Sequence, residues 1–175
     1  MKVESLYHAG FTVSDISNAG EWTMKVEALY HAGFTVSDIE RSIEFYRDVL
    51  GLSLHRRQTG TAEYLSTVTG FKDVRLEIAL LKTPDGNGML ELLQYVSHPA
   101  LPNDRETNRP GNAHVCFKVA DIREACAELK RRGVRLISEP AEVTAGVHKG
   151  ALAVYLRDPD DFTIELFQPA PPAGS

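Results

Sequence analysis

Two histidines and two glutamates stand at matching places in two related stretches of the chain. His31 opens the stretch HAGFTVSDI and His114 opens HVCFKVADI, so the pattern H-x-x-F-x-V-x-D-I occurs twice, 83 residues apart. Glu91 lies in LELLQ and Glu165 in IELFQ, two further matching apolar segments. Two imidazoles and two carboxylates that converge from related halves would form a site for a divalent cation, with positions left for water or substrate.

The position of these side chains within strands supports a shared site. Successive residues of a strand point to opposite faces, and this alternation places both histidines on the face that does not pack beneath a helix. Each glutamate stands in the middle of an apolar strand, where a buried carboxylate needs a partner. The mixed ligand set suits zinc, nickel, cobalt, manganese or ferrous iron and does not choose among them. The alternative is that the histidines bond to backbone carbonyls and the glutamates face solvent or pair with Arg75 or Arg157.

The other potential ligands are expected to have ordinary roles. His55 lies beside two arginines, His98 in a connecting loop and His148 in a turn flanked by glycine, so all three are predicted at the surface. Cys116 shares a strand face with His114, where a cysteine most often packs.

The repeated motifs divide the chain into two modules of the same β-α-β-β-β order. In each, the strand that carries the histidine leads into a helix of 3.6-residue periodicity. Ser37 or Asp38 can cap the first helix and Asp121 the second, and Gly51 and Gly133 can close them. We expect a first module at 24–98, a connecting loop at 99–110, a second module at 111–169 and a tail at 170–175, together one compact domain.

The amino terminus contains a nearly exact copy of the strand that carries His31. Residues 1–16 and 24–39, here called the first copy and the second copy, differ only at Ser5 and Ala28. Only the second copy continues into a helix, so residues 1–23 are interpreted as an extension produced by duplication, an artefact of the start site or of cloning. The first copy can compete for the same sheet position, add to an exposed edge or exchange between chains, and His8 would then take the place of His31.

Composition limits the possible partners. The net charge is −5, no apolar run approaches the roughly 20 residues of a membrane span, and no stripe of basic residues is present. We therefore expect a small-molecule substrate, with no nucleic acid and no membrane as partner. Only two cysteines occur, which favours a reducing cytoplasm over a disulfide framework.

Four segments together resemble the vicinal oxygen chelate superfamily, which includes glyoxalase I, bleomycin resistance proteins and extradiol dioxygenases, with glyoxalase as the nearest pattern. They are YHAGFTVSDIERSIEFYRDVLGL, GMLELLQY, NAHVCFKVADIREACAELKRRGV and YLRDPDDFTIELFQP. The resemblance implies an α+β fold of paired βαβββ modules that form a curved mixed sheet cup. It also implies a divalent metal held by His31, Glu91, His114 and Glu165, and a homodimer. The family's usual DPDG turn is DPDD here, with Asp161 in place of glycine.

Three functions are consistent with such a site. The first is a metal-dependent lyase or isomerase of glyoxalase or epimerase type, in which Glu165 or Glu91 removes a proton next to a chelated carbonyl. The second is an extradiol-type dioxygenase, with His31, His114 and Glu165 around ferrous iron.

The third function is non-catalytic binding of a small molecule, as in a resistance protein, by aromatic side chains that face the cup. The candidates are Tyr64, Phe71, Tyr95 and Tyr155. Residues 59–73, expected as a loop, and the connection at 96–110 are predicted to line the mouth of the cup. The identity of the substrate does not follow from these residues.

Overall fold

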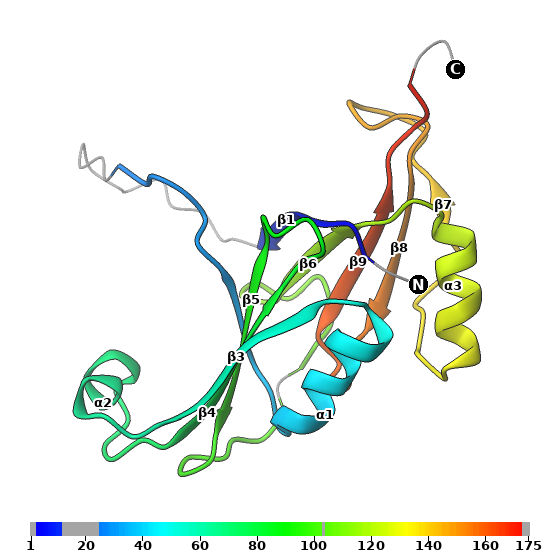
Figure 1. Cartoon of the computed structure of the whole chain (residues 1–175). Coiled ribbons are helices and arrows are strands. Elements are labelled where there is room, and N and C mark those ends of the chain that lie inside the picture. The colour runs from blue at the N-terminus through cyan, green and yellow to red at the C-terminus, as the bar shows by residue number, and fades with distance from the viewer. Residues whose placement is uncertain (1–2, 12–24, 103, 173–175) are drawn as a thin grey trace.

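Two curved sheets form the frame of the protein (Figure 1). The computed structural model describes residues 3–11, 25–102 and 104–172. The strands are β1 (Ser5–Phe11), β2 (Ala32–Thr35), β3 (Ser53–Gly60), β4 (Leu76–Lys82), β5 (Met89–Tyr95), β6 (Ala113–Lys118), β7 (Ala141–Glu142), β8 (Leu152–Arg157) and β9 (Thr163–Gln168). The helical elements are α1 (Ile39–Glu44), continued by the π-helical turn η1 (Phe45–Val49), α2 (Glu63–Thr69) and α3 (Ile122–Arg131).

The two modules share one topology. The first has the strand order β2-β5-β4-β3 and the second β6-β9-β8-β7, and in each the opening strand runs parallel to the closing strand while the remaining pairs are antiparallel. The predicted α+β fold of paired βαβββ modules is therefore confirmed. The exact module boundaries stay predictions.

Both long helices begin as the sequence predicts. The Asp38 carboxylate accepts hydrogen bonds from the backbone N–H groups of Glu40 and Arg41, at 3.0 and 3.2 Å. The Asp121 carboxylate accepts from Arg123 and Glu124, at 2.9 and 3.0 Å. These bonds satisfy N–H groups that have no partner within the helix.

A glutamine from each closing strand completes the same helix start. Gln94 Oε1 accepts from the Ile39 N–H at 3.0 Å, and Gln168 Oε1 accepts from the Ile122 N–H at 2.9 Å. The repeated L-E-L-x-Q and I-E-L-x-Q segments thus connect strand and helix in both modules, a role that sequence reasoning missed.

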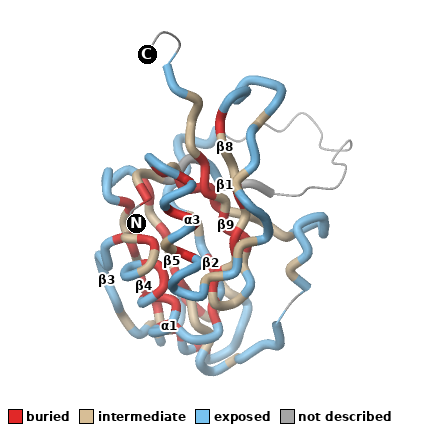
Figure 2. The backbone as a smooth tube through the Cα atoms, turned by 90° about the vertical axis from the view of Figure 1, so that its right-hand side faces the viewer, coloured by how far each residue is buried: buried red, intermediate tan, exposed pale blue. Residues whose placement is uncertain are grey.

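One core joins the modules, and Figure 2 shows its buried backbone running through both sheets. The Phe34 and Phe162 rings, from different modules, stack with centroids 4.0 Å apart. The buried Tyr46 hydroxyl donates to the buried Asp158 carboxylate at 2.9 Å, also across the modules. No helix in the described ranges is long and apolar enough to cross a membrane.

The first copy takes part in the second sheet. Strand β1 pairs antiparallel with β6, on the edge opposite β9, and so makes that sheet five-stranded. The predicted strand of the second copy is correspondingly short, because it begins only at Ala32, and Tyr30, expected beneath the helix, is 79% exposed. Residues 12–16 of the first copy and the link to the second copy lie outside the described residues.

Two further expectations differ from the structure. Residues 59–73 contain helix α2, which Gly70 ends with a left-handed φ of 75°, where a loop was predicted. The predicted β-α-β-β-β order of the second module requires a strand directly after its helix, yet the segment 134–143 contributes only the two residues of β7 and an isolated bridge at Leu136.

Candidate metal centre

Two histidines and one glutamate meet where β1, β6 and β9 lie side by side. The Nε2 atom of His8 lies 3.0 Å from Nε2 of His114 and 3.4 Å from Oε2 of Glu165. Nε2 of His114 lies 3.2 Å from the same carboxylate oxygen. Pairing of β1 with β6 and of β6 with β9 brings the three side chains together, since Cys116 faces His8 on one side and Glu165 on the other.

Burial shapes the protonation of this cluster. Burial lowers the pKa of His114 below its ordinary value, although the Glu165 carboxylate opposes the shift. Burial also raises the pKa of the Cys116 thiol, which hydrogen bonds to Glu165. The Tyr155 ring lies 5.5 Å from that of His114, and burial raises the pKa of its hydroxyl. Burial thus favours the neutral form of His114, the form of an imidazole that binds metal.

The first module holds the second half of the predicted ligand set. Nε2 of His31 lies 3.3 Å from Oε2 of Glu91, so His31 and Glu91 pair just as His114 and Glu165 do. Cys116 also lies close to His8 and Glu165, and neither this group nor the trio of His8, His114 and Glu165 includes His31 or Glu91. Convergence of all four predicted ligands on a single ion stays a prediction.

The alternative that Glu91 and Glu165 pair with Arg75 or Arg157 does not match the observed contacts of these arginines. Arg75 lies 3.6 Å from Glu77, and Arg157 donates to Thr163 and to the backbone carbonyls of Arg105 and Asp161. The carboxylates of Glu91 and Glu165 instead lie next to histidine, and their side chains are only 22% and 12% exposed.

The comparisons with known proteins identify the family. The family model described as Glyoxalase/Bleomycin resistance protein/Dioxygenase superfamily matches residues 28–166. The chain belongs to this superfamily. Its second copy lies within the matched range from residue 28 onward, whereas β1 lies outside it.

Named relatives of this glyoxalase superfamily member include two bacterial proteins. A probable lactoylglutathione lyase of Vibrio cholerae is 32% identical over 131 residues, 73% of this chain and 80% of that protein. The lactoylglutathione lyase of Neisseria meningitidis serogroup B is 28% identical over 132 residues, with the same shares. A crystal structure of a glyoxalase family protein from Bacillus cereus has a TM-score of 0.73 and 27% identity, covering 85% of this chain and 97% of that one.

The cluster of this superfamily member has the dimensions of a metal site. Donor atoms that bind one zinc-sized cation at about 2.1 Å stand roughly 3.0 to 3.4 Å from one another. The three donor atoms of His8, His114 and Glu165 are separated by 3.0, 3.4 and 3.2 Å. These residues therefore fit the divalent metal that the superfamily implies. Sequence reasoning named His8 only as a substitute for His31, and the duplication itself was the signal.

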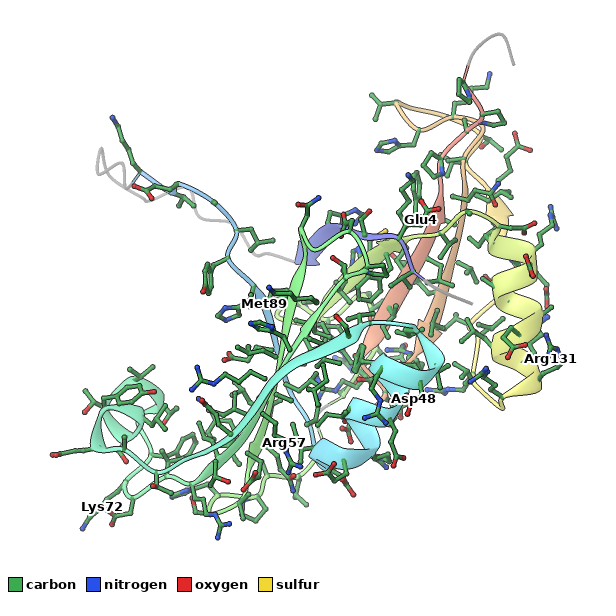
Figure 3. The ribbon with its side chains drawn as sticks, in the orientation of Figure 1. Glu4, Asp48, Arg57, Lys72, Met89 and Arg131 are labelled. Carbon is green, nitrogen blue, oxygen red and sulfur yellow. The ribbon has the colours of Figure 1, made fainter. Side chains whose placement is uncertain are left out.

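The histidines that were predicted at the surface, and Arg57 of β3, make other contacts, and the His148 ring lies 5.2 Å from that of Phe167 on β9. His55 and His148 are exposed, and the His98 ring packs against the Phe71 ring with centroids 5.0 Å apart. Arg57 of β3, labelled in Figure 3, pairs with Glu40 of α1 and with Glu77 of β4.

A cavity of about 460 Å³ lies at the carboxyl ends of β2 and β5. Phe71, Tyr95, Val96, Arg105 and residues 98–102 help to line it, and the role of these loops at the mouth of a metal cup stays a prediction. None of the four predicted ligands lines this cavity, and His31 and Glu91 lie near the opposite ends of the same strands. The two aromatic residues are therefore separated from the histidine cluster.

Proposed function

We propose that the protein is a metal-dependent lyase or isomerase of glyoxalase type, acting on a small molecule with a carbonyl next to an ionisable C–H bond. The observation that carries the proposal is the grouping of His8, His114 and Glu165, whose donor atoms lie within 3.4 Å of one another. The names of the bacterial relatives support hemithioacetals of an α-keto aldehyde as the substrate class.

In the proposed mechanism, His8, His114 and Glu165 would hold a divalent cation, with His31 and Glu91 as the remaining predicted ligands. The cation supplies Lewis acidity that stabilises negative charge on a bound oxygen. Which cation binds, among zinc, nickel, cobalt, manganese and iron, is left open by the N/O donor set.

The carboxylates of this chain move the proton. Glu165 or Glu91 accepts the proton from the substrate carbon, and the same carboxyl group returns it to the neighbouring carbon, so that the reaction needs no oxidant or reductant. Low exposure of Glu165, at 12%, limits the access of water to the transferred proton. Tyr155, whose ring lies against His114, can help to exclude water from this side.

The test combines metal analysis with proton exchange. Purified protein is analysed for bound metal, titrated with each candidate cation, and incubated in deuterium oxide with hemithioacetals formed from glutathione and an α-keto aldehyde. Glu165→Gln is expected to lower deuterium incorporation at the substrate carbon at least 100-fold, while the exposed Glu142→Gln on β7 leaves it unchanged. Undiminished incorporation in Glu165→Gln would contradict the proposal.

A dioxygenase is the second candidate, because the observed group consists of two histidines and one carboxylate. This combination is the ligand set of many non-haem ferrous oxygenases. Oxygen uptake with a catechol after anaerobic loading with ferrous iron would favour this candidate, whereas deuterium incorporation without oxygen uptake favours the lyase.

A further inference from the structure

Two nearly identical segments of this chain lie in opposite environments. Val3 is fully buried in the core, and its N–H donates to the Leu50 carbonyl at 3.0 Å. Val26, its counterpart in the second copy, is 73% exposed, and Leu29 is 64% exposed. Burial of a valine or leucine side chain stabilises a fold by about 1.5 to 3 kcal/mol. The second copy therefore has a favourable site in this molecule that the first copy already occupies.

The edge of β6 fits both copies. Glu4, labelled in Figure 3, lies with its carboxylate 3.0 Å from Lys118 Nζ, and His8 reaches His114. The equivalent residues of the second copy are Glu27 and His31, and the copies differ only at Ser5 and Ala28. Because the edge of a strand recognises backbone groups and alternating side chains, the same sequence can form the same pairs.

Chain connectivity allows the second copy to reach this edge. Strand β2 stands at the end of its sheet, paired with β5 along one side. A strand has two hydrogen-bonding edges, so Ala32 to Phe34 can keep β5 on one edge and accept β6 on the other. The corresponding residues of the first copy, Ala9 to Phe11, pair with β6 in this way. Residues 3–11 would have to leave the edge, and residues 25–31, which lie outside any helix or strand, would have to form new pairs with β6.

We propose that the two copies compete for one edge of β6, so that residues 26–34 replace residues 3–11 within the same chain. With the first copy on the edge, as in Figure 1, the two sheets are separate. When the second copy occupies it, β2 joins the two modules into one continuous sheet in the order β3-β4-β5-β2-β6-β9-β8-β7.

The exchange also changes the ligand of the candidate metal centre, a consequence that rests on the proposed function. His31 would take the place of His8 beside His114 and Glu165, and it directly precedes β2, which pairs with the strand of Glu91. The strand exchange itself does not depend on metal, so cross-linking can detect it whether or not the protein is an enzyme.

Disulfide trapping distinguishes the two arrangements in the full chain. Ser5 is the register partner of Lys118, and antiparallel partners lie within the Cα distance that a disulfide spans. Ser5→Cys with Lys118→Cys traps the first copy on β6, and Ala28→Cys with Lys118→Cys traps the second. Both pairs are equilibrated in a glutathione redox buffer, and the disulfides are quantified by peptide mass spectrometry. Lys118→Cys alone gives the background from Cys116 and Cys126, which are buried.

The twin valines supply matched control variants. Val3→Asp is expected to release the first copy, lowering the 5–118 disulfide and raising the rate of the intramolecular 28–118 disulfide at least 10-fold. Val26→Asp, the same change at the exposed equivalent position, should change neither the amount of the 5–118 disulfide nor the rate of the 28–118 disulfide. Val3→Thr and Val26→Thr repeat the comparison with a smaller polar change if Val3→Asp loses its near-ultraviolet circular dichroism.

Two outcomes would overturn the proposal. In one, the 28–118 disulfide forms in the Val3 variants no faster than a control disulfide between positions 28 and 130, because Lys130 lies on α3 away from β6. In the other, the 28–118 disulfide joins only two different chains, which would show exchange between molecules instead of within one.

Discussion

The Nε2 atoms of His8 and His114 lie 3.0 Å apart, although His8 belongs to a strand outside the range matched by the superfamily. This contact makes the first copy a potential part of the metal centre. His8→Gln is expected to weaken divalent metal binding by more than roughly 10- to 100-fold. That range is the usual effect of mutating a residue that only hydrogen bonds to a metal ligand. His31→Gln, the same change in the second copy, should weaken it less while β1 occupies the edge of β6. Titration calorimetry with zinc measures both, and a larger loss for His31→Gln would contradict the assignment.

The glutamines of the closing strands provide a second prediction, on stability. Gln94→Ala and Gln168→Ala each leave the N–H group of a buried isoleucine at a helix start without its side-chain acceptor. Each is expected to lower the free energy of unfolding by about 1 to 3 kcal/mol. Urea denaturation measures the change, and Gln58→Ala on β3 is the control. Equal stability of all three variants would show that the two bonds contribute nothing.

Tyr46 and Asp158 give a prediction that depends on pH. Burial raises the pKa of Asp158 above its ordinary value, while the Tyr46 hydroxyl and two backbone N–H groups partly oppose the shift. Because the folded-state pKa is raised, the free energy of unfolding falls as pH rises through the ordinary carboxyl range toward neutral. Tyr46→Phe removes one donor and raises this pKa further.

The expected result for Tyr46→Phe is a loss of about 1 to 3 kcal/mol in the free energy of unfolding at pH 7. The loss should shrink as pH falls toward 4, because the raised pKa of Asp158 makes this carboxyl group gain a proton at higher pH than an ordinary one, and protonation removes the charge that the hydroxyl stabilises. Urea denaturation at the two pH values measures the difference. A loss of the same size at both would mean that the hydroxyl acts through packing and not through the carboxylate.

Much of the framework was predictable because it is local. Alternation in strands put His114 and Glu165 where they meet, and the aspartates before both helices act as caps as expected. The role of Gln168 was not predictable, since a glutamine at the end of a strand has no special chemistry until the helix start beside it is known. Helix α2 was missed because glycine and threonine dominate its flanks, although Leu65 is buried.

Which copy of the repeat pairs with β6 could not be decided from local preference. The two segments have almost the same residues, so their strand propensities and side-chain faces are equivalent. They differ in the part of the chain to which each one connects. The second copy leads directly into α1. Asp38 caps this helix, and the N–H of Ser37 donates to the Asp160 carboxylate at 2.9 Å. Residues 25–31, which precede β2, lie outside any helix or strand.

The turn before the last strand gives a final prediction, at the position where the sequence departs from the family pattern. Asp161 has a φ of 62°, in the left-handed region that favours glycine, and its carboxylate pairs with Arg135. Asp161→Gly and Asp161→Ala both remove this exposed ion pair, so the difference between them isolates the backbone. Asp161→Gly is expected to be more stable than Asp161→Ala by about 1 kcal/mol, because only the alanine Cβ clashes in this conformation. Thermal and urea denaturation measure the difference. In ordinary helical or extended backbone alanine would be the more stable of the two, so that order at position 161 would show that the turn does not have the left-handed conformation.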